Sequence, residues 1–317
     1  MSERARQLLV LVGLNVLWTP VNLAVRVATE HGMSPAAVAL ARWSLVALAL
    51  NALLRVPAFA AYARYRPLQG GDRVRAMLLG ALLFAPAHLL YYLGLTRGAS
   101  TVGGTVLNAT APIWTGLLAF VVLGERATPR RLVAILLGFA GAWVVVCGFG
   151  LPSFGSGDGT LLYLVGVVCE SVATVLGARI VRRSSGIGYL AWETTGMVPT
   201  LIAVPLLLGH AMPFEASHLD ASAVGAVAYL VILPGLVCFG VWYATVERVP
   251  LSTMVVTILL QPPLSAFLAW AFTGEVIGPT ILVGSALIVA ALGVVATEKG
   301  GKGEGKKGEK ETVSSSC

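Results

Sequence analysis

The chain has 317 residues, of which 57% are hydrophobic and 12% are charged, and its mean hydropathy is +0.84. This composition leaves too little polar surface to coat a water-soluble protein of this length, so most of the surface must face lipid. The formal charge of +7 does not indicate nucleic-acid binding, because the basic residues follow the loops between apolar segments and form no single patch.

Ten apolar segments of roughly 20 residues, the length needed to cross about 30 Å of hydrocarbon, follow one another along the chain. We place them at residues 8–28, 34–54, 74–95, 101–123, 130–149, 159–181, 188–209, 222–246, 251–273 and 278–297. Each segment must be helical, because lipid offers no partner to backbone polar groups and the alternating strands of a barrel are not seen. The first segment is too long for a signal peptide and no clean cleavage site follows it, so we keep it as helix 1.

The sequence repeats itself at an offset of 150 residues. Pro112, Gly124, Glu125 and Pro129 recur as Pro262, Gly274, Glu275 and Pro279. If each half holds five spans, the second half must sit upside down relative to the first. We therefore predict an all-α integral membrane protein with ten transmembrane helices as two inverted five-helix repeats, 1–150 and 151–298. Residues 299–317 are too polar to pack and predict a disordered cytoplasmic tail.

The distribution of arginine supports this inversion. With the N-terminus in the cytoplasm, the inner segments hold most of the basic residues: Arg55, Arg64, Arg66, Arg73, Arg75, Arg126, Arg130, Arg131, Arg179, Arg182, Arg183, Arg248 and the lysines of the tail. Only Arg26 and Arg97 fall outside. This pattern predicts a multi-pass protein of the plasma (inner) membrane with both termini cytoplasmic.

The two Pro-to-Gly-Glu segments, 112–125 and 262–275, carry a resemblance to a known family. Together with Trp18, Arg42 and the related stretches 91–97 and 241–247, they resemble the EamA-type family of the drug/metabolite transporter superfamily over nearly all of residues 8–297. The resemblance implies a ten-helix carrier with a substrate cavity between its inverted halves, and export as the direction of transport. Because the family moves amino acids, drugs, nucleotide-linked metabolites and other small solutes, the resemblance names no substrate.

Three charged residues within the predicted spans are candidates for substrate binding or coupling. Glu170 lies near the middle of helix 6, where desolvation favours the neutral carboxyl and suits proton exchange; the alternative is a structural acid bonded to a neighbouring helix. Glu193 lies near the cytoplasmic end of helix 7, where snorkelling or an interhelical bond explains it as well as a substrate role. Arg42 holds the related place in helix 2, and either binds a substrate carboxylate or fastens helices 1 and 2. Because the halves are inverted, we expect no bond between Arg42 and Glu193.

Polar and aromatic residues at helical spacing mark further candidate cavity faces, although each face can equally serve helix packing. They are Asn15, Trp18, Thr19 and Asn22 in helix 1; His88, Tyr91 and Tyr92 in helix 3; Thr105, Asn108, Pro112 and Thr115 in helix 4; Trp242 and Tyr243 in helix 8; and Thr257, Gln261 and Ser265 in helix 9. The aromatic side chains suit stacking on a ring or an organic cation. The two prolines free backbone carbonyls at mid-membrane for a polar solute.

The Gly-Glu pairs are better explained by architecture, with Gly124 as a left-handed helix cap and Glu125 at the start of the next helix. In helices 5 and 10, small residues one turn apart predict close packing. These are Ala134, Gly138, Ala142, Ala286 and Ala290.

The sequence has no P-loop in a suitable context, no spaced metal ligands and no nucleophile motif, which argues against an enzyme or an ATP-driven pump and predicts no cofactor and no metal. The expected partners are a small-molecule solute, the lipid bilayer and protons, with a homodimer as an option. The leading hypothesis is a proton-coupled secondary transporter of a small polar or amphipathic metabolite, an amino acid or a drug-like solute, that works by alternating access. The alternatives are a membrane scaffold or sensor without flux, and a solute exchanger that ignores protons.

Overall fold

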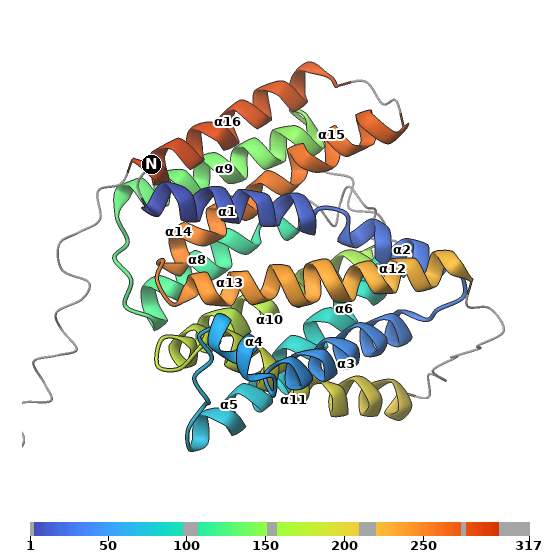
Figure 1. Ribbon diagram of the computed structural model, residues 1–317. Coiled ribbons are helices and arrows are strands. Elements are labelled where there is room, and N and C mark those ends of the chain that lie inside the picture. Colours follow the sequence, from blue (N-terminus) through green and yellow to red (C-terminus); the bar gives the residue numbers. More distant parts are fainter. Residues whose placement is uncertain (1–2, 98–106, 151–156, 209–219, 274–276, 298–317) are drawn as a thin grey trace, which may run out of the picture.

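The structure is a computed structural model, described here for residues 3–97, 107–150, 157–208, 220–273 and 277–297. These residues fold into helices without a strand, arranged as a bundle whose long members run roughly along one direction (Figure 1). The first half contains α1 (Glu3–Trp18), α2 (Val21–Glu30), α3 (Pro35–Leu53), α4 (Pro57–Tyr62), α5 (Gly71–Leu79), η1 (Gly80–Phe84), α6 (Ala85–Thr96), α8 (Ala111–Val122) and α9 (Pro129–Cys147). The second half contains α10 (Gly157–Val181), α11 (Gly186–Leu207), α12 (Ala221–Leu230), η3 (Val231–Cys238), α13 (Phe239–Val246), α14 (Leu251–Met254), η4 (Val255–Leu260), α15 (Gln261–Thr273) and α16 (Pro279–Ala296).

Within these ranges, nine helical stretches are long and apolar enough to cross a membrane. They are Leu9–Glu30, Pro35–Leu53, Gly71–Thr96, Pro129–Cys147, Asp158–Val181, Gly186–Leu207, Ala221–Val246, Leu251–Leu268 and Pro279–Ala296. The remaining predicted span is represented by α8, a shorter apolar helix, since the first part of that span lies outside the described residues. The predicted all-α membrane architecture is confirmed.

Helices α9 and α16, which end the two halves, lie side by side and run in opposite directions (Figure 1). Near the start of α9, Arg130 donates a hydrogen bond to the carbonyl of Thr297, just beyond the end of α16. Just beyond the other end of α9, Gly148 lies against the side chain of Thr280 at the start of α16. Equivalent helices of the two repeats are thus antiparallel, as an inverted duplication requires.

The other helix pairs follow the same twofold logic. In the first repeat α6 packs on α10 of the second, and in return α12 of the second repeat packs on α2 of the first. Helix α3 packs on its own equivalent, α11. The two repeats therefore exchange contacts reciprocally, which leaves a shared interior between them.

The close approach of α9 and α16 depends on glycine. A methyl group added at Gly141 would lie 2.7 Å from the carbonyl oxygen of Gly284, which is tighter than any real contact. The prediction of small-residue packing holds for α9, where Ala134 and Ala142 are buried. In α16 the predicted residues are wrong: Ala286 and Ala290 are exposed on the lipid side, and Gly284 and Ala291 form the contact, because the helix is rotated in a way that its uniformly apolar sequence does not reveal.

Several spans change their winding near the middle. Helix 1 breaks at Thr19 and Pro20, between α1 and α2. Helices 3 and 8 contain wide π-helical turns, η1 and η3, at related places in the two repeats. Helix 9 tightens into the 3-10 segment η4 before Gln261. Irregular turns of this kind are frequent at functional sites, and Thr19 at the first break and Val255 and Ile258 of η4 line the interior cavity.

Pro112 and Pro262 each occupy the second residue of a helix, α8 and α15. In the first turn of a helix a backbone N–H has no partner within the helix, so the N–H that proline lacks costs no hydrogen bond there. The helices are therefore interrupted by the turns before the prolines and not by the prolines themselves. The expectation that Gly124 caps a helix with a left-handed backbone is confirmed by its φ of +65°.

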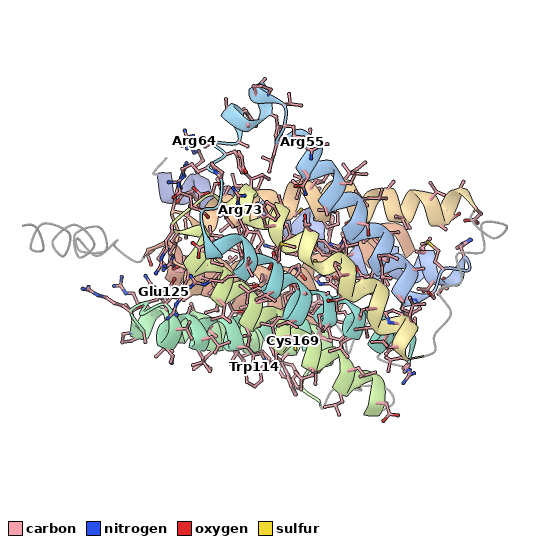
Figure 2. All side chains as sticks on the ribbon, turned by 90° about the horizontal axis from the view of Figure 1, so that it is seen from below. Arg55, Arg64, Arg73, Trp114, Glu125 and Cys169 are labelled. Atoms are coloured by element: carbon pink, nitrogen blue, oxygen red, sulfur yellow. The ribbon has the colours of Figure 1, made fainter. Side chains whose placement is uncertain are left out.

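Figure 2 shows Arg64 and Glu125 toward the same end of the bundle, the end that we predicted to be cytoplasmic. The predicted tail, 299–317, and the second Gly-Glu pair, 274–275, lie outside the described residues, as does Thr105.

Candidate functional site

A cavity of about 140 Å³ lies between the two repeats. A dry engineered cavity of similar volume holds a benzene molecule, so this one has room for a small organic solute. Its walls combine polar and aromatic side chains from both halves, namely Trp18, Thr19, Val21, Asn22, Arg42, His88, Tyr91, Tyr92, Asn108, Ala111, Thr115, Tyr163, Val167, Glu170, Ser171, Thr174, Phe239, Trp242, Val255, Ile258 and Gln261. Twelve of the predicted candidates therefore share one site: Trp18, Thr19, Asn22, Arg42, His88, Tyr91, Tyr92, Asn108, Thr115, Glu170, Trp242 and Gln261.

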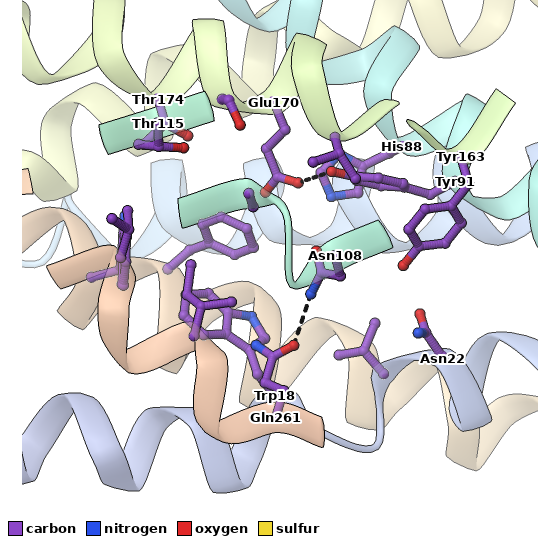
Figure 3. A pocket seen from close by; sticks show the side chains of 18 of the residues that line it. Trp18, Asn22, His88, Tyr91, Asn108, Thr115, Tyr163, Glu170, Thr174 and Gln261 are labelled. Carbon is purple, nitrogen blue, oxygen red and sulfur yellow. Dashed lines mark hydrogen bonds between the residues drawn. The ribbon is translucent and has the colours of Figure 1, made fainter. Parts of the chain in front are cut away.

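Glu170 stands on the α10 wall of the cavity (Figure 3). Its Oε2 accepts a 2.5 Å hydrogen bond from the hydroxyl of Tyr91 on α6. Tyr91 is nearly buried and its ring packs on that of Tyr163, with 4.8 Å between the centroids. Among the described residues no cation forms an ion pair with Glu170, so its carboxyl is available to a ligand or a proton from the cavity.

The opposite wall is formed by amide side chains (Figure 3). Asn108 donates a 2.8 Å hydrogen bond to Gln261, and Gln261 donates in turn to Asn15 over 3.2 Å. Asn15 itself is fully buried and donates a hydrogen bond to Thr257. Within the predicted polar stripe of helix 1, Asn15 is therefore the residue that serves helix packing. Asn22 faces the hydroxyl of Tyr163 across the cavity rim. The chain of amides joins helices 1, 4 and 9 and places polar groups at the breaks of all three.

Aromatic rings form a third surface. Trp18 packs edge-on against Phe239 and Trp242, with centroid distances of 5.1 Å and 5.5 Å. Trp18 and Trp242 come from helices 1 and 8, which are not equivalent in the repeat, so the surface belongs to neither half alone. Such edge-to-face clusters are rigid and apolar, which suits an apolar portion of a solute.

His88 and Arg42 both contact the side chain of Tyr92. The Nδ1 atom of His88 is 2.9 Å from the carbonyl of Phe84, and because a carbonyl only accepts, Nδ1 carries the proton. The Arg42 guanidinium donates to the hydroxyl of Tyr92 over 2.7 Å and stacks on Trp43, 4.5 Å from the ring centre. Both residues line the cavity, although each is at least 96% buried.

Of the three charged candidates, Glu193 does not line the cavity. It is completely buried, and its carboxyl accepts hydrogen bonds from Tyr189 and Tyr243 at 2.7 Å and 3.0 Å. The snorkelling interpretation is wrong, because the side chain turns into the packed interface of α11 and α13 and not toward the headgroups. Its interhelical alternative agrees with this geometry, and no bond joins Glu193 to Arg42.

Sequence reasoning missed the rest of the α10 wall: Tyr163, Val167, Ser171 and Thr174. With Glu170 they are spaced by three or four residues, which puts them on one face of a helix. That spacing was available in the sequence as a signal.

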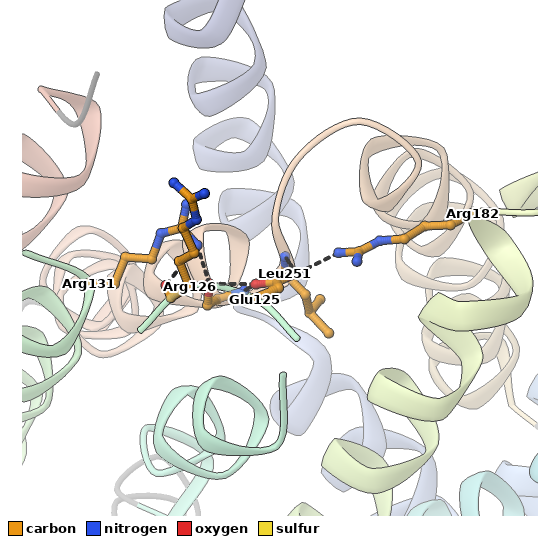
Figure 4. A network of polar contacts seen from close by, with 6 residues as sticks. Glu125, Arg126, Arg131, Arg182 and Leu251 are labelled. Atoms are coloured by element: carbon orange, nitrogen blue, oxygen red, sulfur yellow. Dashed lines mark hydrogen bonds and ion pairs between the residues drawn. The ribbon is translucent and has the colours of Figure 1, made fainter. Parts of the chain in front are cut away.

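Glu125 binds across the repeats at the arginine-rich end (Figure 4). Its carboxylate accepts bonds from the backbone N–H of Leu251 at 2.8 Å, from the N–H and hydroxyl of Ser252 at 3.0 Å and 2.6 Å, and from Arg182 at 2.5 Å. Burial opposes its ionisation, but the bonds from Ser252, Leu251 and Arg182 outweigh burial and hold the pKa of Glu125 below its ordinary value. The prediction that Glu125 opens the next helix is wrong: Thr128 caps α9, and Glu125 caps α14 in the other repeat. We call the set of Glu125, Arg182, Leu251 and Ser252 the Glu125 clamp.

A second set of contacts closes the same end. Glu247 accepts a 2.6 Å bond from the N–H of Gly186 and lies 3.7 Å from Arg66. Ser185 donates to the carbonyl of Arg66 and accepts from its N–H. Helices 7 and 8 and the loop between helices 2 and 3 are thereby fastened together.

Comparison with known proteins accounts for this architecture. The model of the EamA-like transporter family matches residues 6–147 and again residues 158–297, once for each repeat. The chain belongs to the EamA-like transporter family. A "probable terminal-alkyne amino-acid exporter" of Streptantibioticus cattleyicolor is 28% identical over 87% of this chain and 89% of its own length. The uncharacterized transporter YdfC of Bacillus subtilis is 27% identical over 84% of this chain and 82% of its own.

The EamA-like fold is also present in a solved structure. A crystal structure of another protein matches 92% of this chain and 98% of its own length, with a TM-score of 0.72 and 19% sequence identity. At that identity the likeness concerns the fold. Family and relatives agree that this chain is a multi-pass membrane transporter, and the cavity between its repeats is the candidate site.

Proposed function

We propose that this EamA-like protein is a secondary transporter that exports a small polar or amphipathic solute by alternating access, in exchange for protons. The observation that carries the proposal is the carboxyl of Glu170, which stands in the cavity between the repeats, bound by Tyr91 and paired with no cation in the described part of the chain. An ionisable group at such a place is costly, and it persists where ions or substrates pass.

Proton coupling follows from competition at Glu170. A carboxylate attracts a cationic group of the solute, and a proton that binds to the same oxygen abolishes that attraction. Solute and proton then occupy the site in turn, which is the requirement for exchange. The Glu125 clamp fastens the repeats at the arginine-rich end, so this conformation represents one side of the cycle, and opening that end requires the clamp to break.

The solute that we propose belongs to one of two classes, amino acids or drug-like molecules. The relative from Streptantibioticus cattleyicolor is named as an exporter of an amino acid with a terminal alkyne, a solute with both a charged and an apolar part. The cavity offers surfaces for both parts of such a solute. Glu170 and Arg42 supply charged groups, and the rings of Trp18, Phe239 and Trp242 supply an apolar surface. This agreement favours amino acids.

The arginine distribution supports a location in the plasma membrane with both termini in the cytoplasm. Fusion of a periplasmic reporter enzyme to residue 297 tests this orientation, and reporter activity there would overturn it. A homodimer is the assembly that we propose alongside, and light scattering of the detergent-solubilised protein measures it.

The test of the proposed function is flux in proteoliposomes with a panel of amino acids, organic cations and nucleotide sugars, with and without a pH gradient. We expect gradient-driven flux of one class, which Glu170→Gln abolishes without loss of folded protein. Flux that ignores the gradient and needs a counter-solute would support the proton-independent exchanger. Folded protein that moves nothing would support the scaffold or sensor.

A further inference from the structure

Helix α4 (Pro57–Tyr62) is an apolar segment that the rest of the bundle does not cover. It belongs to the loop between helices 2 and 3, and none of its residues is buried. No other described helix packs extensively on it. Figure 2 shows this stretch standing out from the side of the bundle between Arg55 and Arg64, near the end that carries Glu125. A segment at the side of a membrane-spanning bundle, close to one end, lies at the depth of the lipid headgroups.

The composition of this segment does not suit water. From Val56 to Ala63 no residue is charged, and the hydroxyl of Tyr62 is the only polar side-chain group. Tyr62 is 87% exposed and Val56 is 48% exposed. The exposed apolar surface continues from α3, where Leu48 is 68% exposed and Leu53 is 36% exposed. Because tyrosine is enriched at the membrane–water interface and apolar side chains enter its acyl boundary, lipid is the neighbour that fits this surface.

Positive charge surrounds the apolar segment. Residues 54–75 contain one acidic side chain, Asp72, and five arginines, namely Arg55, Arg64, Arg66, Arg73 and Arg75. Three of these arginines are engaged in contacts with Glu247, Leu68 and Asp72. Arg55 and Arg64 are exposed, and no described residue pairs with either guanidinium group. Two free cations therefore flank α4, one on each side.

The backbone at Arg64 is a second, independent observation. Among the described residues Arg64 is the only one other than glycine with a positive φ, +50°. It takes the left-handed position that ends α4, where its N–H donates to the carbonyl of Ala61 at 3.1 Å and the N–H of Tyr65 donates to the carbonyl of Ala60 at 2.8 Å. Glycine fits this position without strain. A strained arginine at a place that favours glycine points to a role for the arginine side chain itself.

We propose that α4 lies in the headgroup layer of the leaflet at the arginine-rich end, and that Arg55 and Arg64 bind the phosphate groups of anionic phospholipids there. A guanidinium group pairs with phosphate oxygens in a bidentate geometry. The attraction of one arginine to an anionic surface corresponds to about a fivefold rise in local lipid concentration. A zwitterionic headgroup offers the same phosphate together with a compensating ammonium group, so the site prefers anionic lipid. This site is separate from the solute cavity and does not depend on which solute is carried.

The test places a fluorescent reporter on α4. The full-length protein, with its four native cysteines replaced and Tyr62→Cys introduced, is labelled with an environment-sensitive dye and reconstituted into nanodiscs. The discs contain equal amounts of phosphatidylcholine and phosphatidylglycerol, and one lipid or the other carries bromine near the top of its acyl chains to quench the dye. We expect emission typical of the interface. Brominated phosphatidylglycerol should quench about fivefold or more strongly than brominated phosphatidylcholine, and high salt should weaken this preference.

Variants assign the preference to residues. Arg64→Gly should reduce the preference about fivefold, while the melting temperature in detergent stays the same or rises because glycine relieves the left-handed backbone. A merely structural role for Arg64 would not separate these two readouts. Arg55→Gln should reduce the preference to a similar extent. Arg75→Gln is the matched control, because Arg75 is an exposed arginine of the same loop whose charge is already paired with Asp72, and it should leave the preference unchanged.

Three outcomes would overturn the proposal. Equal quenching by the two lipids in the wild type, or an undiminished preference in both Arg55→Gln and Arg64→Gly, would overturn the binding of anionic lipid. Emission typical of water in every lipid would overturn the location of α4 in the headgroup layer and would leave this apolar surface to a protein partner. A loss of preference in Arg75→Gln as large as that in Arg64→Gly would show that any positive charge of the loop serves, and would overturn the assignment to the two free arginines.

Discussion

The Glu125 clamp should set how often the arginine-rich end of the transporter opens. Ser252→Ala is the sharpest change, because it removes one hydroxyl and leaves the backbone N–H groups that bind the same carboxylate. Ser252 is fully buried, and its hydroxyl donates to Glu125 Oε2 at 2.6 Å. A hydrogen bond to a charged group contributes about 1.5–3 kcal/mol.

That contribution fixes the expected magnitude. If the bond exists only while this end is closed, its loss shifts the equilibrium toward the open form by the same free energy, which is a factor of about 10 to 150. Water that enters the site and hydrates Glu125 recovers part of this free energy, so we expect a shift near the lower end of the range.

The readout is a single cysteine at Thr174, a cavity-lining residue of α10 that is 9% exposed, in a chain whose four native cysteines are replaced. A membrane-impermeant maleimide is applied to that side of the membrane on which Glu125 lies. We expect Ser252→Ala to raise the labelling rate about tenfold or more.

Thr253→Val is the matched control. Thr253 is the residue after Ser252 in α14 and is equally buried, and among the described residues its hydroxyl has no hydrogen-bond partner. Its replacement should therefore leave the labelling rate unchanged. The reasoning is refuted if folded Ser252→Ala labels at the wild-type rate, or if Thr253→Val accelerates labelling as much.

Further predictions concern pH and packing. The pKa of Glu125 in the closed protein lies below its ordinary value of 4.5. The clamp is therefore fully formed above pH 4.5 and is lost only when the pH falls through that lowered pKa. The rate of cysteine labelling should be constant between about pH 7 and 5, and a rise within that window would contradict the assignment. Gly141→Ala should destabilise the helix pair by about 1–3 kcal/mol, since the new methyl group meets a backbone oxygen at 2.7 Å. Gly293→Ala on α16 has open space around it and should raise the melting temperature slightly, so equal melting temperatures of the two variants in detergent would contradict this. Tyr243→Phe should lower the free energy of unfolding by about 1–3 kcal/mol, because it leaves a buried carboxyl oxygen without its donor. Tyr62→Phe, at a tyrosine that is 87% exposed, should leave the midpoint of denaturant unfolding where it is in the wild type.

The spans, the duplication and most of the cavity were readable from the sequence, because each depends on local composition or on periodicity. A twenty-residue apolar run needs no partner to identify it, and the three-to-four spacing of Asn15, Trp18 and Asn22 marks an inward face whatever helix lies opposite. The repeat then supplied the inversion, since a five-helix unit cannot end on the side on which it began.

What the sequence could not supply were contacts between distant residues. Glu125 reaches α14, more than a hundred residues away, and nothing near Glu125 in the chain indicates that partner. Glu193 bonds to Tyr243 on another helix, fifty residues away, and its own surroundings in the chain do not indicate that partner. Its bond to Tyr189, four residues earlier on the same helix, follows a spacing that the sequence does show. The π-helical turns in helices 3 and 8, by contrast, have local signals in the sequence. Pro86 lies two residues beyond the end of η1 and Pro234 lies within η3, and a proline inside a helix removes a backbone hydrogen bond.

The central claim is that a solute and a proton exchange at Glu170, and one measurement tests it most directly. Proteoliposomes are loaded with a pH-sensitive dye and with the solute that the flux panel identifies. Proton movement is recorded when an outward gradient of that solute is imposed without a pH gradient. The account predicts proton flow opposite to the solute in the wild type and none in Glu170→Gln. Solute efflux with no accompanying proton movement in the wild type would contradict it.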